Sequence, residues 1–397
     1  MKESKLAPNY NPLPVVVATA EGEWITDVEG RRYYDALAGY SSLNFGHRHP
    51  GLIKAAKDQM DRVTLVSRAF DFELLEPFAD ALTDLCGMDM MLPMNTGAEA
   101  VETAIKAARK WGHDIKGIAN SQSLIIVAEK NFHGRTTTIV SFSCDDVARD
   151  SFGPFSPGFL AVPYGDTEAL EKAIHQNADK LAAVLLEPIQ GESGVNIPPD
   201  DYLRAARRLT QEANTLLILD EIQSGLGRTG YTFAWERVGV KPDLMTLGKA
   251  LGGGIFPVSA CVGKKEVMEL MTPGTHGSTF GGNPIACALG IAVCELLSTG
   301  EYQMRAREMG EHFQARLDDM VERGLLLAKR GVGMWAGIDV DPERATGRAV
   351  CELLMDKGVL AKDTHGSTVR FAPPLTTSRE DLDWMLDQLE AVLNEIS

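Results

Sequence analysis

The chain is poor in basic and aromatic residues and lacks long apolar runs. Of its 397 residues, 7% are aromatic, and 39 Lys and Arg residues stand against 55 Asp and Glu residues, a formal net charge of −16. A chain this acidic repels nucleic-acid phosphates and anionic lipids, so we expect neither nucleic acid nor a membrane as a partner. Since no segment approaches about 18 uninterrupted apolar residues, no membrane-spanning helix is predicted.

The cysteines lack the spacing of a metal or redox motif. No C-x-x-C pair occurs, and we expect all 6 thiols to be reduced and buried. Residues 1–10 contain no apolar core of a secretory signal, so we expect a cytoplasmic protein. His47 and His49 flank Arg48, but the following Pro50 favours a turn and a helix start over a metal site, so no metal is predicted.

Short apolar runs alternate with amphipathic helical patterns between about residues 90 and 265. The runs predict strands at Leu124–Val127, Thr137–Phe142, Phe159–Val162, Ala182–Leu186, Leu216–Leu219, Leu244–Leu247 and Val258–Val262. Strands that are apolar throughout and separated by helices indicate an α/β fold with a mainly parallel sheet covered by helices. Such sheets bind ligands at the carboxyl ends of their strands.

The N-terminal part follows a different pattern. Residues 22–37 alternate around a D-x-x-G turn and predict a hairpin. Pro50 then opens a helix that runs to about Val63, because proline is favoured in the first helical turn.

The sequence pattern changes after about residue 284. It predicts helices at 285–297 and 304–324, strands near Gly333–Val340 and Thr368–Phe371, and a last helix capped by Thr377 and Glu380. We therefore predict a large domain over residues 50–284. A smaller α+β domain would combine residues 1–49 with residues 285–397.

An aspartate ends one of the apolar strands. In Leu216-Leu-Ile-Leu-Asp220 the carboxylate follows four apolar residues. It could begin a loop or cap a helix. Alternatively it stays buried and needs a cationic partner, because an unpaired buried charge is costly.

A lysine follows another apolar strand. In Leu247-Gly-Lys249-Ala-Leu-Gly-Gly-Gly the flanking residues place the stem of the lysine in the interior, although most lysines lie at the surface. A desolvated lysine loses basicity and becomes a nucleophile toward aldehydes.

Small residues open a predicted helix at Gly97 and Ala98. Asn95 or Thr96 can cap it, and its inner stripe comprises Val101, Ala104, Ile105 and Ala108. The exposed backbone N–H groups and the helix dipole favour an anion such as phosphate there.

These three features together match one ligand, pyridoxal 5′-phosphate. Lys249 can bond to its aldehyde, Asp220 can pair with its pyridinium nitrogen, and the helix start at Gly97 can hold its phosphate. Phe132, in Asn131-Phe-His-Gly-Arg135, is available to stack on the ring.

Motifs across nearly the whole chain point to a family. The first group contains Asp220-Glu-Ile-Gln223, Gly248-Lys249-Ala250 and His276-Gly-Ser-Thr279. The second contains Asn9-Tyr10-Asn11-Pro12-Leu13-Pro14 and Arg370-Phe-Ala-Pro-Pro-Leu375. On the first group the chain resembles the fold-type I, class III pyridoxal-phosphate aminotransferases, and on the second it is similar to their ornithine δ-aminotransferase branch.

This resemblance implies roles around the cofactor ring. Lys249 corresponds to the lysine that forms a Schiff base with the cofactor. Asp220 corresponds to the partner of the pyridinium nitrogen, and Gln223 to the group near the phenolic oxygen. Phe132 would stack on one face of the ring and Ile222 on the other.

The resemblance also implies how the phosphate is bound. Gly97 and Ala98 would bind it from the helix start. Thr279, together with Ser278, would reach it from a second subunit. A homodimer with shared active sites is therefore expected.

Five further residues correspond to substrate contacts. Arg370 would hold the α-carboxylate of glutamate, and Glu192 would be its removable partner. Tyr10 and Arg135 would hold the α-carboxylate of ornithine, and Tyr40 corresponds to a specificity residue.

The implied activity is ping-pong transfer of the δ-amino group of L-ornithine to 2-oxoglutarate, giving L-glutamate 5-semialdehyde and L-glutamate. Such an activity serves arginine breakdown or proline biosynthesis. The alternatives are another class III ω-aminotransferase acting on acetylornithine, 4-aminobutyrate or lysine, an aminomutase, or a regulator without turnover. Phe45 stands where the family usually has an amide, and we expect it to alter nearby packing or hydrogen bonding.

Overall fold

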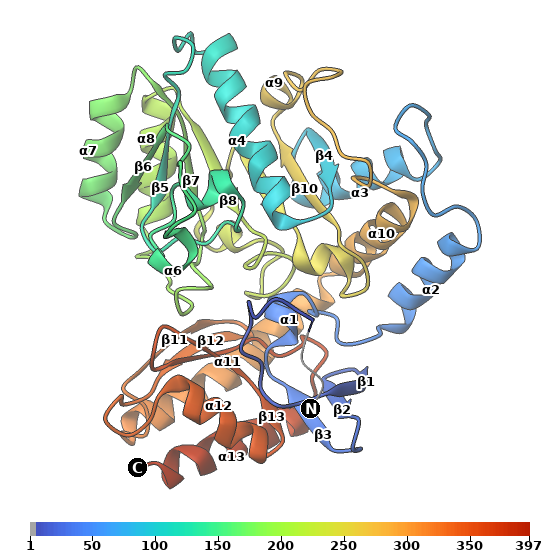
Figure 1. Cartoon of the computed structure of the whole chain (residues 1–397), viewed down its shortest axis with the longest axis vertical. Helices are drawn as coiled ribbons and strands as arrows, with labels where there is room; N and C mark the ends of the chain where they lie inside the picture. Colours follow the sequence, from blue (N-terminus) through green and yellow to red (C-terminus); the bar gives the residue numbers. More distant parts are fainter. Residues whose placement is uncertain (1–4) are drawn as a thin grey trace.

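The computed structural model describes residues 5–397 and divides into two bodies, one above the other in Figure 1. The upper body contains a seven-stranded sheet with helices on both sides. The lower body contains two four-stranded sheets and helices from the C-terminal part of the chain. The short helix α1 (Ala38–Ser41) lies between the bodies.

The large sheet has the strand order β4-β10-β9-β8-β7-β5-β6. Its strands are β4 (Met90–Met94), β5 (Leu124–Ala128), β6 (Phe159–Val162), β7 (Leu181–Leu186), β8 (Leu216–Asp220), β9 (Leu244–Leu247) and β10 (Ser259–Gly263). Five neighbouring strands, β6, β5, β7, β8 and β9, run parallel. Strand β10 is antiparallel to both of its neighbours. The predicted mainly parallel sheet is confirmed.

Both faces of this sheet are buried, which explains why its strands are apolar throughout. Ile125 and Val127 of β5 pack in one core with α4 (Gly97–Asp114). Their neighbour Ile126 packs in another core with α7 and α8. Successive residues of a strand point to opposite faces, so each face needs its own apolar set.

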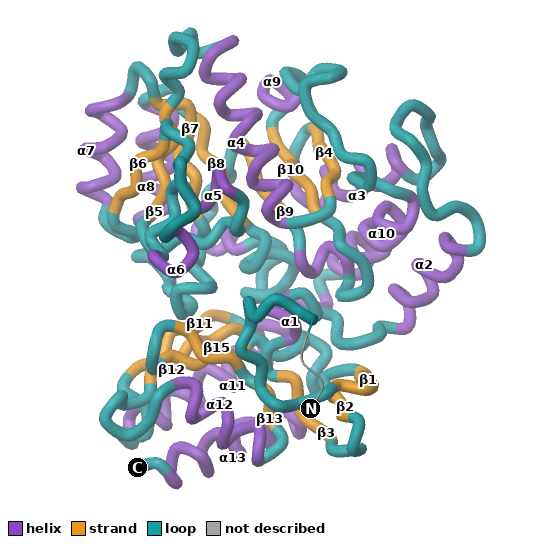
Figure 2. The backbone as a smooth tube through the Cα atoms, in the orientation of Figure 1, coloured by secondary structure: helices purple, strands orange, loops and turns teal. Residues whose placement is uncertain are grey.

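Helices of the upper body pack on the large sheet or on one another, and Figure 2 draws them in purple. They are α2 (Pro50–Met60), α3 (Leu75–Cys86), α5 (Thr137–Val140), α6 (Asp146–Arg149), α7 (Thr167–Asn177), α8 (Tyr202–Glu212), α9 (Lys265–Met268) and α10 (Pro284–Ser298), with 3-10 helices η1 (Ala234–Val238) and η2 (Lys249–Gly252).

One predicted strand is wrong, and one strand was missed. The run Thr137–Phe142 is no strand but begins with the short helix α5, because the Thr136 side chain accepts a hydrogen bond from the Ile139 N–H and caps it. Strand propensity of β-branched residues is a weak preference that such a cap outweighs. Strand β4 was not predicted: it contains Pro93, which is tolerated because β4 lies at the sheet edge.

The lower body joins both ends of the chain. One sheet has the order β1-β2-β3-β13 and the other β11-β12-β15-β14. The strands are β1 (Val17–Glu21), β2 (Trp24–Asp27), β3 (Arg32–Asp35), β11 (Ala328–Val332), β12 (Trp335–Asp339), β13 (Val359–Leu360), β14 (Lys362–Thr364) and β15 (Thr368–Phe371). The predicted hairpin is β2 and β3, and β3 pairs in parallel with β13.

Helices α11 (Glu301–Glu322), α12 (Gly347–Asp356) and α13 (Arg379–Glu395) belong to the lower body. The cap of α13 is Ser378, whose hydroxyl accepts from the Asp381 N–H, so the prediction of Thr377 and Glu380 is wrong by one residue. Thr377 is buried instead, and its hydroxyl lies 2.8 Å from that of Tyr34.

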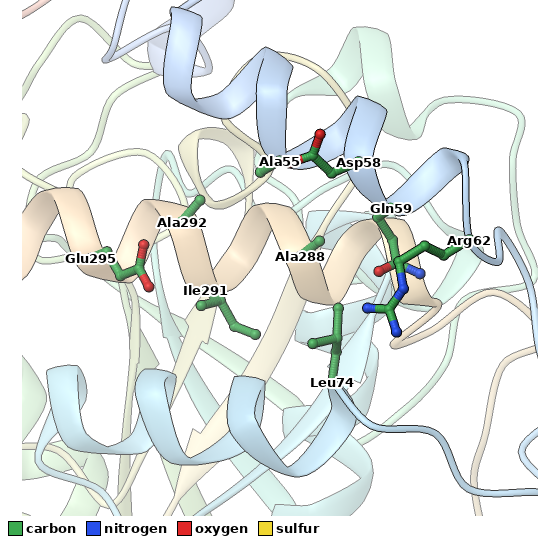
Figure 3. A pocket seen from close by; sticks show the side chains of 9 residues that line it. All are labelled: Ala55, Asp58, Gln59, Arg62, Leu74, Ala288, Ile291, Ala292 and Glu295. Atoms are coloured by element: carbon green, nitrogen blue, oxygen red, sulfur yellow. The ribbon is translucent and has the colours of Figure 1, made fainter.

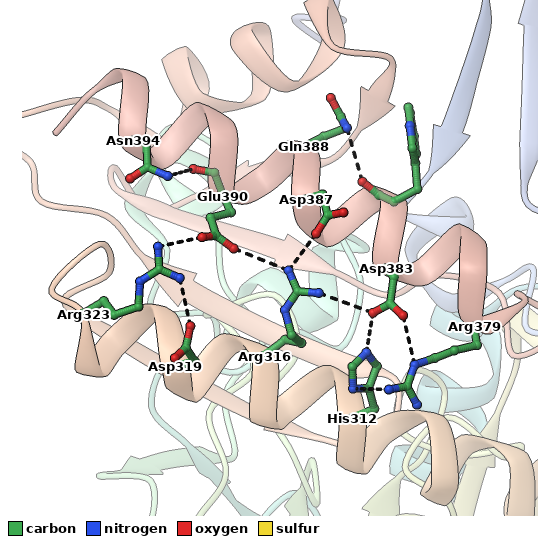
Figure 4. Close-up of polar contacts among 11 residues, drawn as sticks. His312, Arg316, Asp319, Arg323, Arg379, Asp383, Asp387, Gln388, Glu390 and Asn394 are labelled. Atoms are coloured by element: carbon green, nitrogen blue, oxygen red, sulfur yellow. Dashed lines mark hydrogen bonds and ion pairs between the residues drawn. The ribbon is translucent and has the colours of Figure 1, made fainter.

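Charged side chains link α11 to α13 on their outer faces (Figure 4). Arg316 lies 2.8 Å from Asp387 and 3.4 Å from both Asp383 and Glu390. Such partly exposed pairs each contribute about 0–1 kcal/mol, so the apolar stripe of α13 carries most of the packing energy. That stripe is buried as predicted: Leu382, Met385, Leu386, Leu389, Val392 and Leu393.

Helix α10 packs on α2 and α3 and continues across a bend into α11. The predicted boundary at residue 284 stays a prediction. Among residues 5–397 no single helix is long and apolar enough to cross a membrane, and α10 with α11 passes only as a pair bent by 61°.

The cysteines are all free in the described chain, but one prediction about them is wrong. Cys144, in the loop between α5 and α6, is exposed, whereas the other cysteines are buried. Its flanking residues form no regular element that would cover it.

Candidate active site

Three ionisable side chains follow strands at the carboxyl edge of the large sheet. His133 follows β5, Glu187 follows β7 and Asp220 ends β8. Nδ1 of His133 lies 2.6 Å from Oδ2 of Asp220, and both side chains are buried. Asp220 Oδ1 accepts a hydrogen bond from the Ile222 N–H at 3.1 Å. Of the two alternatives for Asp220, the structure has the buried carboxylate.

Burial and charge shift the pKa values in this cluster. Burial lowers the pKa of His133, but the hydrogen bond and the charge of Asp220 outweigh burial, so this pKa lies above its ordinary value. Burial raises the pKa of Glu187 to about 8, against the charge of His133. Glu187 Oε2 accepts a hydrogen bond from the Phe132 N–H at 3.0 Å.

Sequence reasoning missed His133 and Glu187 as functional residues. Each follows a strand of the parallel sheet within a motif that was noticed for other reasons. The signal that could have found them is this position, since polar groups at the carboxyl ends of neighbouring strands gather at one edge.

Lys249 begins η2 directly after β9 and Gly248. Its φ of 45° lies in the left-handed region, which is uncommon for a residue with a side chain. Burial lowers the pKa of its ammonium to about 8, although the charges of Glu192 and Asp220 favour the protonated form. Burial therefore favours the neutral amine, which is the form that attacks an aldehyde.

The start of α4 has the properties of an anion site. Thr96 forms the cap, in a capping box, which settles the choice that the sequence left open. A Cβ added to Gly97 would lie 3.0 Å from Cδ1 of Ile222, and one added to Gly134 would lie 3.0 Å from Cβ of Ala98. Only small residues fit here, and they leave the first backbone N–H groups of the helix accessible to an anion.

Arg370 of β15 contacts the loop that follows β7. Its Nη1 lies 2.9 Å from Oε1 of Glu192 and donates to the Gly191 carbonyl at 3.2 Å. The Arg370 side chain is 4% exposed and that of Glu192 is 25% exposed. Burial opposes ionisation of Glu192, but the charge and hydrogen bond of Arg370 prevail and lower its pKa. The pairing of these two residues, predicted from the family resemblance, is present.

The other expected substrate contacts surround this pair. The Arg370 guanidinium lies 5.5 Å from the ring centroid of Tyr40, whose pKa is raised by burial and by the Glu192 charge. Tyr10 and Arg135 are exposed, and both act electrostatically on Tyr40. They lie at the outer side of the site.

Two of the cofactor contacts predicted for the ring lie close to these groups. Arg135 lies 5.6 Å from the ring centroid of Phe132. A Cβ added to Gly191 would lie 2.2 Å from Oε1 of Gln223. Gln223 therefore packs on the backbone whose carbonyl binds Arg370.

Ser278 and Thr279 lie on a loop anchored to α4 of the same chain. Ser278 Oγ accepts from Asn95 Nδ2 at 2.8 Å. His276 is 2.8 Å from the Thr103 hydroxyl and 3.0 Å from the Lys106 ammonium, and burial together with the Lys106 charge lowers its pKa. Thr279 is exposed and lines a cavity of about 570 Å³.

This donor set fits pyridoxal phosphate. Asp220 is a buried carboxylate for a ring nitrogen, the small residues at Gly97 suit a phosphate, and Lys249 is an amine with depressed pKa. Nε2 of His133 is buried and has no hydrogen-bond partner among the described residues. The described residues contain no group of three or more His, Cys, Asp or Glu side chains suited to a metal ion.

Phe45, the departure from the family pattern, does not reach this site. It is buried in the core beside α2, with its ring edge-on to Tyr302 at 5.0 Å between centroids. Its effect on packing relative to the family stays a prediction, and the neighbouring Asn44 makes polar contacts.

A separate cavity of about 270 Å³ lies between α2 and α10 (Figure 3). Its floor is formed by Ala288, Ile291 and Leu74, with Arg62 and other charged side chains at the edge. It contains no lysine, cysteine or histidine for covalent chemistry, so we do not assign the active site to it.

Comparison with known proteins agrees with this geometry. The sequence profile of the family described as Aminotransferase class-III matches residues 5–393. An ornithine aminotransferase of Brevibacillus brevis is 49% identical over 388 residues, covering 98% of this chain and 96% of that protein.

Solved structures are similar over the whole chain. The ornithine aminotransferase of Toxoplasma gondii superposes with a TM-score of 0.96 at 39% identity, covering 99% of this chain and 93% of its own. An acetylornithine aminotransferase from Elizabethkingia anophelis gives a TM-score of 0.89 at 40% identity, covering 98% and 96%. The predicted fold-type I architecture is confirmed.

Proposed function

Because the chain belongs to the class-III aminotransferases, which depend on pyridoxal 5′-phosphate, we propose that it transfers the δ-amino group of L-ornithine to 2-oxoglutarate. The products would be L-glutamate 5-semialdehyde and L-glutamate. The observation that carries this proposal is the Arg370–Glu192 pair beside Tyr40, with Tyr10 and Arg135 at the outer side.

The bound cofactor supplies an aldehyde for the amino group and a ring that accepts the electrons of the broken C–H bond. Lys249 would hold the cofactor, and once the substrate amine had displaced it, the freed Nζ would take the proton from the substrate carbon. Asp220 would keep the ring nitrogen protonated, and His133, at 2.6 Å, fixes the orientation of the Asp220 carboxylate. Glu187 fixes the backbone of Phe132.

The remaining cofactor contacts orient the ring and the phosphate. Phe132 and Ile222 would enclose the ring, and Gln223 would bind its phenolic oxygen. Gly97 and Ala98 would donate backbone N–H groups to the phosphate, at the positive end of the α4 dipole.

One site must handle two substrates that present different carbons. Glutamate reacts at its α-carbon, so Arg370 binds its α-carboxylate with a bidentate, charge-assisted pair. Ornithine brings no carboxylate to that place, and an unpaired buried Arg370 would be costly. Glu192 pairs with it in the ornithine half-reaction and moves away in the glutamate half-reaction, while Tyr10 and Arg135 hold the ornithine carboxylate.

Replacing Glu192 with alanine should change the relative rates of the two half-reactions. With Arg370 left without its partner, we expect the glutamate half-reaction to gain at least tenfold relative to the ornithine half-reaction, or about 1.4 kcal/mol. Tyr10→Phe should move the same ratio by a different route: loss of a hydrogen bond to a charged group should weaken ornithine alone, by about 1–3 kcal/mol, and leave the glutamate half-reaction unchanged. Single-turnover rates of both half-reactions measure the effects, and equal changes in both halves would contradict the proposed exchange.

The second candidate is an acetylornithine aminotransferase, favoured by the similarity to the Elizabethkingia anophelis structure. A panel of amino donors with 2-oxoglutarate separates the candidates. We expect L-ornithine to exceed N-acetylornithine, 4-aminobutyrate and L-lysine in kcat/KM. A preference for any of these other donors would overturn the ornithine assignment.

We further propose a cytoplasmic homodimer in which Thr279 and Ser278 of one subunit bind the phosphate of the other. Thr279 is exposed, and large apolar side chains on or near its loop are exposed as well: Phe280 is 50%, Leu65 40% and Phe70 71% exposed. Exposed apolar surface of this kind favours burial against another chain.

Mixed dimers test the shared site. Lys249→Ala and Thr279→Ala proteins should each be impaired, but a hybrid dimer contains one site with both residues intact. We therefore expect mixing after mild dissociation to restore up to about a quarter of wild-type activity, because half of the dimers are hybrids with one intact site. A monomer with full activity at high dilution, measured by sedimentation and assay, would contradict the prediction.

A further inference from the structure

Arg228 is a buried cation that contacts no carboxylate of residues 5–397. The residue is 0% exposed, and burial lowers the pKa of its guanidinium to about 9. Nη1 donates to the carbonyls of Met334 at 2.8 Å and Pro373 at 2.6 Å, and Nη2 donates to Asn44 Oδ1 at 2.5 Å. Nε has no partner. Burying a cation against neutral acceptors is costly, so its place in the fold requires an explanation.

The three acceptors come from separate segments of the chain. Arg228 lies in the loop after β8, five residues beyond Gln223. Met334 directly precedes β12, Pro373 follows β15, and Asn44 belongs to the N-terminal part. One guanidinium thus joins the loop of the upper body that carries the expected ring contacts to the sheet of the lower body.

Backbone packing around Arg228 reinforces this junction. Asn44 Nδ2 donates to the Leu226 carbonyl at 2.9 Å, and the Asn44 carbonyl accepts from the Leu375 N–H at 2.8 Å. A Cβ added to Gly333 would lie 2.7 Å from the carbonyl carbon of Thr229, so the two backbones touch.

The bound carbonyls lie next to the Arg370–Glu192 pair. Pro373 is three residues beyond Arg370 on the same segment. Met334 precedes Trp335, whose Cζ2 would lie 2.7 Å from a Cβ added to Gly191. Gly191 in turn accepts the hydrogen bond from Arg370. Arg228 therefore holds both the strand segment that carries Arg370 and the side chain that supports its acceptor.

We infer that Arg228 is a positioning residue that sets the Arg370–Glu192 pair at a fixed place relative to Asp220 and Gln223. The inference rests on the proposed function, in which Arg370 binds the α-carboxylate of glutamate. Replacing Arg228 should weaken the binding of dicarboxylate substrates. Ornithine should be affected less, because it presents its carboxylate to Tyr10 and Arg135 instead.

The test compares Arg228→Lys with Arg305→Lys. A lysine ammonium lacks the planar fork that reaches acceptors in three segments, so Arg228→Lys should loosen the junction. Arg305 of α11 donates to the carbonyls of Leu375, Thr376 and Thr377 at 2.7–3.0 Å, all within the lower body. It is a matched control that loses contacts to carbonyls of the same segment without touching the upper body.

For Arg228→Lys we expect the KM for 2-oxoglutarate and the dissociation constant of glutarate, an unreactive dicarboxylate, to rise at least tenfold. Single-turnover reaction with ornithine should change less than threefold, and the visible absorbance of bound cofactor should stay. Arg305→Lys should lower the Tm without changing the ratio between the two substrates. Calorimetry with glutarate provides a readout independent of turnover.

Proportional losses for both substrates, or an unchanged glutarate affinity with a lower Tm, would overturn the inference and leave Arg228 a structural residue. If Arg228→Lys does not fold, Asn44→Ala removes one acceptor and should give a weaker shift in the same direction; no shift would again overturn it. Failure of the proposed function looks different, because the wild-type protein itself would then not use ornithine.

Discussion

Lys249→Ala is expected to lose nearly all turnover and the visible absorbance of the covalently held cofactor, while the fold persists. Lys249 is the amine at the carboxyl edge of the sheet, near Asp220 and Glu192, and its burial lowers its pKa to about 8. Removing the group proposed to carry a proton between substrate carbon and cofactor should slow turnover by several orders of magnitude, at about 1.4 kcal/mol for each tenfold. Absorbance spectra, steady-state rates and far-UV circular dichroism measure these outcomes.

Lys116 provides the matched control. Burial also lowers the pKa of its ammonium to about 8, but it donates to the carbonyls of Leu181 and Ala213, at the opposite edge of the sheet. Borohydride reduction of wild-type protein should therefore fix the cofactor on the peptide with Lys249 and not on that with Lys116. A Lys249→Ala protein that keeps its activity and traps cofactor elsewhere would refute the assignment.

The depressed pKa also predicts a pH dependence. The pKa of Lys249 lies below that of a free lysine, so deprotonation of its amine occurs near pH 8 instead of above pH 10. Capture of pyridoxal phosphate by apoprotein should accelerate as the pH rises through about 8. A rate that keeps rising toward pH 10 would indicate an ordinary lysine.

Asp220→Asn is expected to bind the cofactor but to slow proton removal from the substrate by several orders of magnitude. The carboxylate is buried, and in the proposed mechanism its charge keeps the ring nitrogen of the cofactor protonated. An amide of the same shape cannot do so. A loss below about tenfold, or about 1.4 kcal/mol, in single-turnover experiments would mean that Asp220 is only structural.

The Asp220→Asn variant can also be tested without the cofactor, through the pKa of His133. The hydrogen bond and charge of Asp220 raise the pKa of His133 against burial, so in apo Asp220→Asn that pKa should fall, which an NMR titration detects. Asp243→Asn is the control: Asp243 is also buried, pairs with Arg207 at 2.8 Å and Lys264 at 2.7 Å, and lies before β9 at the other edge. It should lower stability while leaving the His133 pKa and the chemical step unchanged.

The sequence alone determined the framework of the fold. Strands such as β5 and β8 are buried on both faces, so their apolar runs stand out against the amphipathic helices. Asp220 and Lys249 were identifiable because a charged residue at the end of an apolar strand is rare and costly. The cap at Thr96 and the small residues after it are likewise local features.

Predictions failed where a local preference met a competing contact. The β-branched run after Thr136 begins a helix because a cap satisfied its first N–H groups. Strand β4 escaped notice because Pro93 is compatible with a strand only at an edge, and edges are set by the sheet order. The cap of α13 is Ser378 and not Thr377, because the Thr377 hydroxyl forms a hydrogen bond with the Tyr34 hydroxyl.

Only the tertiary structure decided which groups act together. His133 and Asp220 are 87 residues apart and meet because β5, β7 and β8 end at one edge of the sheet. Arg228 had no local feature that marked it, yet it binds carbonyls 106 and 145 residues away. Composition and spacing report the burial preference of a segment, whereas pair contacts depend on strand order and on which backbone groups remain unpaired once the bodies pack.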